Sequence, residues 1–274
     1  MRLERWPVIG ICRRLVRTGQ LTLIVPALAF GLCAGLVVLG VLPEAAVAVA
    51  GVATGHGALL ATALGWTEFD RRAGLRPVTD SLTVVGLLAL AATAARTMPW
   101  GAAAYLAVPL WLAWQARLGR LAPLGLTGPI RVRPLMLGLA LGGALGAHLL
   151  LSSTRTLGYH VRTDDISGYL AAVAYDVGAN VPSSELFFRG ALFNAAQRLG
   201  AFPLAAALAT GANLARYVID PLLPKTPEVL LGTLFYVTLL GVANAWLLWW
   251  SGSLLPGLLS ALVFFAVYRL LAMA

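Results

Sequence analysis

The stretch Pro-Ser-Ser-Glu-Leu-Phe-Phe-Arg-Gly, residues 182–190, places a carboxylate and a guanidinium four residues apart in a largely apolar part of the chain. On a helix this spacing puts Glu185 and Arg189 on one face, with the acid nearer the N-terminus, which is the favourable order for pairing. Ionisable groups inside a membrane-spanning segment are costly and usually functional. A buried ion pair that holds helices together is the alternative interpretation.

The composition around this stretch predicts a membrane protein. Of the 274 residues, 59% are hydrophobic and only 11% are charged, and the mean hydropathy is +0.84. One soluble core cannot bury that much apolar surface, so we expect an all-α, polytopic membrane bundle of about eight to nine transmembrane helices.

The charge pattern excludes nucleic acid as a partner. The formal net charge is +9, but the arginines cluster in short segments between apolar runs, and Lys225 is the only lysine. Such clusters are typical of cytoplasmic loops that face anionic lipid headgroups. We therefore expect membrane lipids as partners and a cytoplasmic N-terminus.

The basic segments divide the chain into three predicted parts. Residues 1–19 form a basic cytoplasmic segment, residues 20–133 a four-helix transmembrane half, and residues 134–274 a second transmembrane core. The boundary near residue 133 follows a loop of arginines, prolines and glycines that is too broken for a helix.

Helix boundaries and helix contacts can be predicted from proline, serine and glycine positions. Pro182 predicts that residues 167–181 and 182–199 are separate helices, with Ser183 or Ser184 near the cap of the second. Glycines four residues apart predict close contact between helices. They occur at Gly31 and Gly35, and at Gly138, Gly142 and Gly146.

The three histidines predict no metal site. His56 lies alone inside an apolar run, where a hydrogen bond to a neighbouring helix is the ordinary use of the side chain. His148 and His160 are too isolated to share a cation. We therefore expect no metal and no cofactor.

The run Ser184-Glu185-Leu186-Phe187-Phe188-Arg189-Gly190 resembles the E-E-x-x-F-R-G signature of the CPBP (Abi) family of intramembrane proteases. That family includes the type II CAAX prenyl endopeptidases. Residues 204–218 resemble its second motif helix, and residues 253–259, Ser-Leu-Leu-Pro-Gly-Leu-Leu, resemble its closing segment. The resemblance implies a CPBP-like helical core in the C-terminal half and a protein of the bacterial cytoplasmic membrane.

Four positions depart from the catalytic pattern that the resemblance implies. The family uses the first glutamate, a histidine on the next motif helix, and a histidine and an asparagine on the last helix to activate water. Those positions fall here on Ser184, Asn213, Ala261 and Phe265. Glu185 and Arg189 remain, but a carboxylate neutralised by an arginine and without imidazole is a poor base and a poor zinc ligand.

Three functional readings follow. The first is a non-catalytic CPBP-like protein, a binding or scaffold subunit of a membrane complex whose former active-site groove holds another subunit or an apolar ligand. The second is an active CAAX-type endopeptidase that uses Glu185 with His148. The third is a small lipid or solute transporter with a polar pathway through Asp176, Glu185, Arg189 and Arg216.

Overall fold

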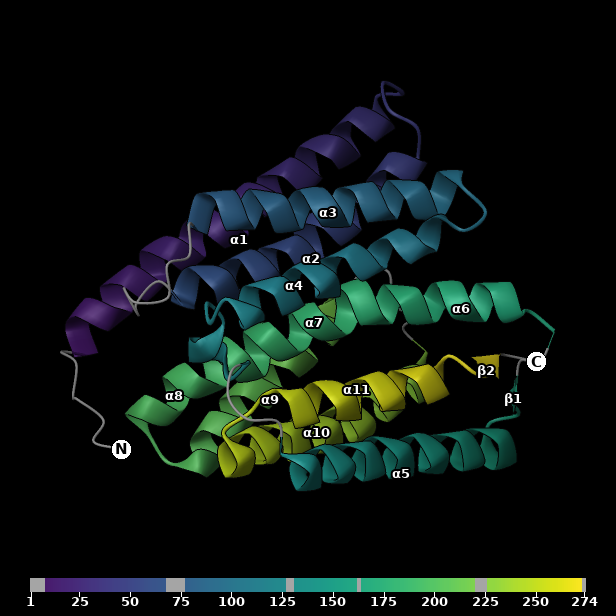
Figure 1. The fold of residues 1–274 in the computed structure, drawn as a ribbon. Helices are drawn as coiled ribbons and strands as arrows, with labels where there is room; N and C mark the ends of the chain where they lie inside the picture. Colours follow the sequence, from purple (N-terminus) through teal and green to yellow (C-terminus); the bar gives the residue numbers. More distant parts are fainter. Residues whose placement is uncertain (1–7, 68–76, 127–130, 162–163, 220–225, 273–274) are drawn as a thin grey trace.

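The computed structural model describes residues 8–67, 77–126, 131–161, 164–219 and 226–272, and it is built almost wholly from helices (Figure 1). The first half comprises α1 (Val8–Val38), α2 (Ala45–Thr67), α3 (Pro77–Thr97), the 3-10 helix η1 (Gly101–Leu106), α4 (Ala107–Arg117) and the 3-10 turn η2 (Ala122–Leu124). The next elements are α5 (Val132–Thr156), β1 (His160–Val161), α6 (Ile166–Tyr175), the π-helical segment η3 (Asp176–Asn180), α7 (Val181–Ser184), the π-helical segment η4 (Glu185–Phe193) and α8 (Asn194–Leu199). The chain continues through α9 (Phe202–Ile219), α10 (Pro227–Ser251), α11 (Leu255–Tyr268) and β2 (Leu271–Ala272). The predicted all-α class is confirmed.

The segment from α6 to α8 crosses the middle of the molecule (Figure 1). Helices α1 to α4 lie on one side of it, and α5, α10 and α11 lie on the other. The main buried apolar cluster joins α2, α3 and α4 to η4 through side chains such as Leu60, Leu88, Val108 and Phe193. The Glu185–Arg189 stretch is therefore held at the centre of the bundle.

Three helices among the described residues are long and apolar enough to cross a membrane. They span Ala45–Trp66, Val132–Thr156 and Val229–Ser251, and two shorter apolar helices span Ile24–Val38 and Leu255–Tyr268. Large apolar side chains such as Leu90 and Leu110 are exposed on the outside of the bundle. Such a surface is stable against lipid and costly against water, so the chain is that of an integral membrane protein.

The predicted boundary at Pro182 is wrong, because α6, η3, α7, η4 and α8 form one uninterrupted helix from Ile166 to Leu199. A proline inside an α-helix removes a backbone hydrogen bond and crowds the preceding turn. Here Pro182 is the second residue after the wider turns of η3. Such π-helical turns have a different bonding pattern and concentrate at functional sites.

The first helix also differs from the expectation. The predicted division at residue 19 would separate a surface helix from the first span, whereas α1 runs without interruption from Val8 to Val38. Residues 1–7 of the predicted basic segment lie outside the described residues.

The glycine stripe on α5 makes the predicted close contact, and its partner is α11. A Cβ atom at Gly138 would meet the carbonyl oxygen of Pro256, and one at Gly142 would meet that of Ser260. In contrast, no described atom lies within 4 Å of a Cβ added at Gly31 or Gly35. Equal spacing therefore led to close packing on α5 but not on α1.

The one pairing of extended segments in the described chain is very short. His160 pairs with Ala272 and Val161 with Leu271, antiparallel, so the segment after α5 lies beside the segment after α11 (Figure 1).

Candidate functional site

The Glu185–Arg189 pair forms as its spacing predicts. Glu185 Oε1 lies 3.5 Å from Arg189 Nη1, and the two residues are 3% and 1% exposed. Both side chains project from η4, the second π-helical segment of the continuous helix. The pair is thus enclosed by protein. Removing either side chain would leave the other charge buried without a partner.

Polar side chains of α9 and α10 and a glycine of α11 lie beside this pair. Gly241 and Gly257 border it: a Cβ at Gly241 would lie 2.5 Å from Arg189 Nη2 and 2.9 Å from Thr210 Oγ1, and one at Gly257 would lie 3.5 Å from Glu185 Oε2. Asn244, beside Gly257, also faces this space. The buried residues Asn213 of α9 and Ser260 of α11 are grouped with these four, and we call Glu185, Arg189, Thr210, Asn213, Asn244 and Ser260 the central polar cluster.

The central polar cluster has unused hydrogen-bonding capacity. Buried side-chain atoms without a hydrogen-bond partner among the described residues are Glu185 Oε2, Arg189 Nε and Nη1, Thr210 Oγ1, Asn213 Oδ1, Asn244 Oδ1 and Nδ2, and Ser260 Oγ. Buried polar groups are nearly always satisfied, because an unsatisfied group costs free energy. The cluster is therefore suited to hold water or a polar group of a ligand.

A second group of polar side chains involves residues that precede Glu185 on the same helix. His56 of α2 places Nδ1 2.7 Å from Ser183 Oγ and Nε2 2.6 Å from Tyr175 Oη. The predicted use of His56, a hydrogen bond to a neighbouring helix, is confirmed. The structure shows that its partners are Ser183 and Tyr175 of the continuous helix.

Ser183 and His56 are as close as a catalytic nucleophile and its base, but a substrate cannot reach the Ser183 hydroxyl. Ser183 is fully buried, and its hydroxyl also donates to the carbonyl oxygen of Asn180 at 3.0 Å. Nucleophilic catalysis requires the hydroxyl to reach a substrate carbonyl. We therefore assign Ser183 and His56 to the packing of α2 against the continuous helix.

The interpretation of Ser184 as a helix cap is wrong. Ser184 lies inside the continuous helix, where its backbone has helical angles and its hydroxyl caps no backbone group. Instead, Arg216 of α9 donates from Nη1 to Ser184 Oγ at 2.5 Å. Arg216 Nη2 also lies 3.4 Å from Asn180 Oδ1, so one guanidinium ties α9 to two positions of the continuous helix.

The network continues to the end of α11. Asn180 Nδ2 donates to Asp176 Oδ1 at 3.0 Å, and Arg269 donates to both oxygens of Asp176 at 2.6 and 2.9 Å. Asp176 is 2% exposed. The bidentate geometry and the burial make this a strong, orienting contact. Asp176 and Arg216 of the suggested polar pathway thus share one network, separate from the Glu185–Arg189 pair.

The remaining predicted positions lie in different surroundings. Asn213 is buried on α9 in the central polar cluster. Ala261 packs in a second apolar cluster with Leu149 and Leu240, and Phe265 packs against that cluster.

His148 was suggested as a partner for Glu185, but its Nδ1 lies 2.8 Å from Tyr236 Oη instead. Tyr236 is two helical turns from Asn244, a distance of about 12 Å along α10.

A divalent cation does not fit the central polar cluster. Its described side chains supply one carboxylate, already paired with Arg189, together with amides and hydroxyls. Zinc sites are built from imidazole, thiolate and carboxylate ligands. Within the described part of the chain, no group of three or more His, Cys, Asp or Glu residues is placed to hold a metal ion.

Several members of these clusters could not be singled out from the sequence. Asn244 and Ser260 stand alone in apolar runs, and only the fold brings Asn244 beside Glu185. A single amide in a membrane span is a weak signal, since such groups often only link helices.

These features define the class: a helical membrane protein with a central, π-helical segment that presents a Glu-x-x-x-Arg pair to three other helices. The family model described as type II CAAX prenyl endopeptidase, Rce1-like, matches residues 167–267. This match confirms the predicted resemblance, and it shows that residues 167–267 are similar to that family. No curated protein and no solved structure matches the chain.

Replacing Ser184 with alanine is expected to lower the free energy of unfolding by about 1.5 to 3 kcal/mol, because Arg216 would lose a buried, charge-assisted acceptor. Thermal unfolding of the purified protein in mild detergent measures this change. The matched control is Ser260→Ala, since Ser260 is also buried but its hydroxyl has no partner among the described residues. Equal midpoints for the two variants would show that the Arg216 contact contributes little.

Proposed function

We propose that this protein is a non-catalytic relative of the CAAX prenyl endopeptidases that acts as a binding or scaffold subunit of a membrane protein complex. The observation that carries the proposal is the contact between Ser184 and Arg216. The position at which the resemblance implies the first catalytic glutamate holds a serine whose hydroxyl accepts a hydrogen bond from a guanidinium at 2.5 Å. That position serves the packing of α9 rather than the activation of water.

The rest of the central polar cluster supports the same conclusion. Peptide hydrolysis needs a base to activate water and donors to stabilise the oxyanion. The carboxylate that remains, Glu185, is paired with Arg189, and Asn213 is an amide that cannot act as a base. Ala261 and Phe265 are apolar and favour the packing of an apolar group there.

The helices and the buried polar atoms that the fold retains support the binding role. The helices that carry the family signature still enclose Glu185 and Arg189, and polar atoms of Asn213 and Asn244 remain without partners in the described residues. A transmembrane helix or a lipid-like ligand with one polar group would satisfy these atoms and cover the apolar positions near Phe265. Interhelical hydrogen bonds of this kind stabilise contacts within membranes.

The purified protein in liposomes is expected to release no tripeptide from a farnesylated CAAX peptide. The reason is the absence of a free base at Ser184 and Glu185. Release of the tripeptide is measured by mass spectrometry, with an active type II CAAX endopeptidase in the same liposomes as the positive control. Cleavage above background would contradict the proposal, and its loss in a Ser183→Ala or a Glu185→Gln variant would identify the group responsible.

Site-specific crosslinking tests the binding role separately. A photoreactive amino acid at Phe265 should form a discrete protein or ligand adduct in native membranes. The same group at Leu90, which is 69% exposed on α3, serves as the lipid-facing control. Adducts of equal amount and identity at both positions would contradict a specific occupant of the former groove.

A further inference from the structure

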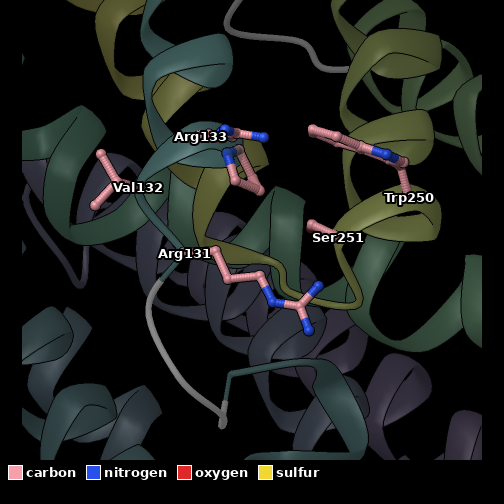
Figure 2. A pocket seen from close by; sticks show the side chains of 6 residues that line it. Arg131, Val132, Arg133, Trp250 and Ser251 are labelled. Carbon is pink, nitrogen blue, oxygen red and sulfur yellow. The ribbon is translucent and has the colours of Figure 1, made fainter.

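A hollow at one end of the bundle lies away from the central polar cluster. It has a volume of about 360 Å³ and is lined by Arg131, Val132, Arg133 and Pro134 at the start of α5 and by Trp250 and Ser251 at the end of α10. Figure 2 shows the Arg133 side chain pointing across this hollow towards Trp250, while the Arg131 side chain passes below Ser251. The two guanidinium groups thus come from one side and the indole from the other.

Within the described residues, no ion pair offsets the positive charge of this hollow. The ion pairs among the described residues are Glu185 with Arg189 and Asp176 with Arg269, so neither Arg131 nor Arg133 is paired there. Both arginines are exposed. They also stand at the N-terminal end of α5, where the helix dipole disfavours a cation. The two guanidinium groups and the helix dipole would therefore both favour an anion between Arg131 and Arg133.

The position of the hollow is that of a membrane–water interface. The apolar span of α10 ends here at Ser251. Trp246 and Trp250 stack with ring centroids 5.4 Å apart and an interplanar angle of 4°, and Trp250 is 47% exposed. Tryptophan is enriched at the level of lipid headgroups, because its ring is apolar and its N–H is polar.

We propose that this hollow binds the phosphate headgroup of an anionic phospholipid. Arg131 and Arg133 would hold the phosphate, since guanidinium groups bind phosphate oxygens through several parallel N–H donors. Pro134 and the Trp250 ring would contact the apolar part of the same molecule, which a free phosphate ion lacks. Basic pockets between transmembrane helices are suited to such headgroups. This site does not depend on the binding or scaffold role proposed above.

Binding of phosphatidylglycerol to the purified full-length protein in neutral mild detergent tests this site. The Arg131→Gln/Arg133→Gln protein is expected to bind this lipid about 25-fold more weakly at low ionic strength, because each arginine contributes about a fivefold factor at a lipid surface. Native mass spectrometry of the lipid adducts and quenching of tryptophan fluorescence give two independent readings. Phosphatidylcholine is the neutral comparison and should bind to both proteins equally weakly.

The matched control is the Arg96→Gln/Arg155→Gln protein, which loses the same charge from two exposed arginines in the last turns of α3 and α5. It should bind phosphatidylglycerol as the unmodified protein does. The proposal is overturned if this control loses as much affinity, or if Arg131→Gln/Arg133→Gln binds unchanged. It is also overturned if phosphatidylcholine binds as tightly, or if inorganic phosphate at the lipid concentration displaces phosphatidylglycerol.

Discussion

Replacing Arg189 with alanine is expected to lower the free energy of unfolding by about 3 to 5 kcal/mol, because the Glu185 carboxylate would remain buried without its partner. Arg189 is 1% exposed and Glu185 is 3% exposed, so water cannot take over the role of the guanidinium. A loss of this size is a large share of the stability of an ordinary domain. The measurements are the yield of monodisperse protein after detergent extraction and its thermal midpoint.

Two further variants separate loss of the pair from loss of an arginine. Arg198→Ala, on the same continuous helix but exposed, should leave the yield and midpoint unchanged. Glu185→Gln/Arg189→Met removes both charges and should regain much of the stability, since replacing a buried pair costs less than breaking it. A thermal midpoint for Arg189→Ala equal to that of the unmodified protein would refute the dependence of the fold on this pair.

Replacing Gly142 with alanine is expected to lower the free energy of unfolding by about 1 to 3 kcal/mol, by forcing α5 away from α11. The added Cβ would meet the carbonyl oxygen of Ser260, a backbone atom that cannot rotate aside. The thermal midpoint and the yield of folded protein again measure the change.

The adjacent residue provides the control for this substitution. A Cβ at Gly143 would have no atom within 4 Å, so Gly143→Ala should be neutral or stabilising by about 0.5 to 1 kcal/mol. If the two variants shifted the midpoint equally and in the same direction, the close approach of α5 and α11 would not be the cause.

The sequence alone predicts those structural features that a local pattern of residues determines. The spacing of Glu185 and Arg189 is enough to pair them on any helix, and the apolar composition is enough to predict the helical membrane bundle. The glycines of α5 also made the predicted contact, whereas Gly31 and Gly35 did not. The spacing of small residues permits a close approach, but it does not supply the partner helix.

Predictions from local patterns were wrong where contacts between distant segments determine the helix geometry. Pro182 and Ser184 have the residue types of a helix start, yet they lie inside a continuous helix whose π-helical segments change the pattern of backbone bonds. Ser184 is used by Arg216 on another helix, and Ser183 by His56, which is 127 residues away in the chain. No spacing rule connects residues that far apart.

The short pairing of β1 with β2 restricts the membrane topology. It brings the chain after α5 and the chain after α11 to the same side, and the contacts of Gly138 with Pro256 and of Gly142 with Ser260 show that these two helices run parallel. The number of membrane crossings from the end of α5 to the end of α11, with α11 included, must then be even. Four long helical elements lie on that path, namely the continuous helix from Ile166 to Leu199, α9, α10 and α11, and one pass by each would satisfy this condition. Two separate passes on either side of Pro182, with one pass by each of the other three helices, would not satisfy it.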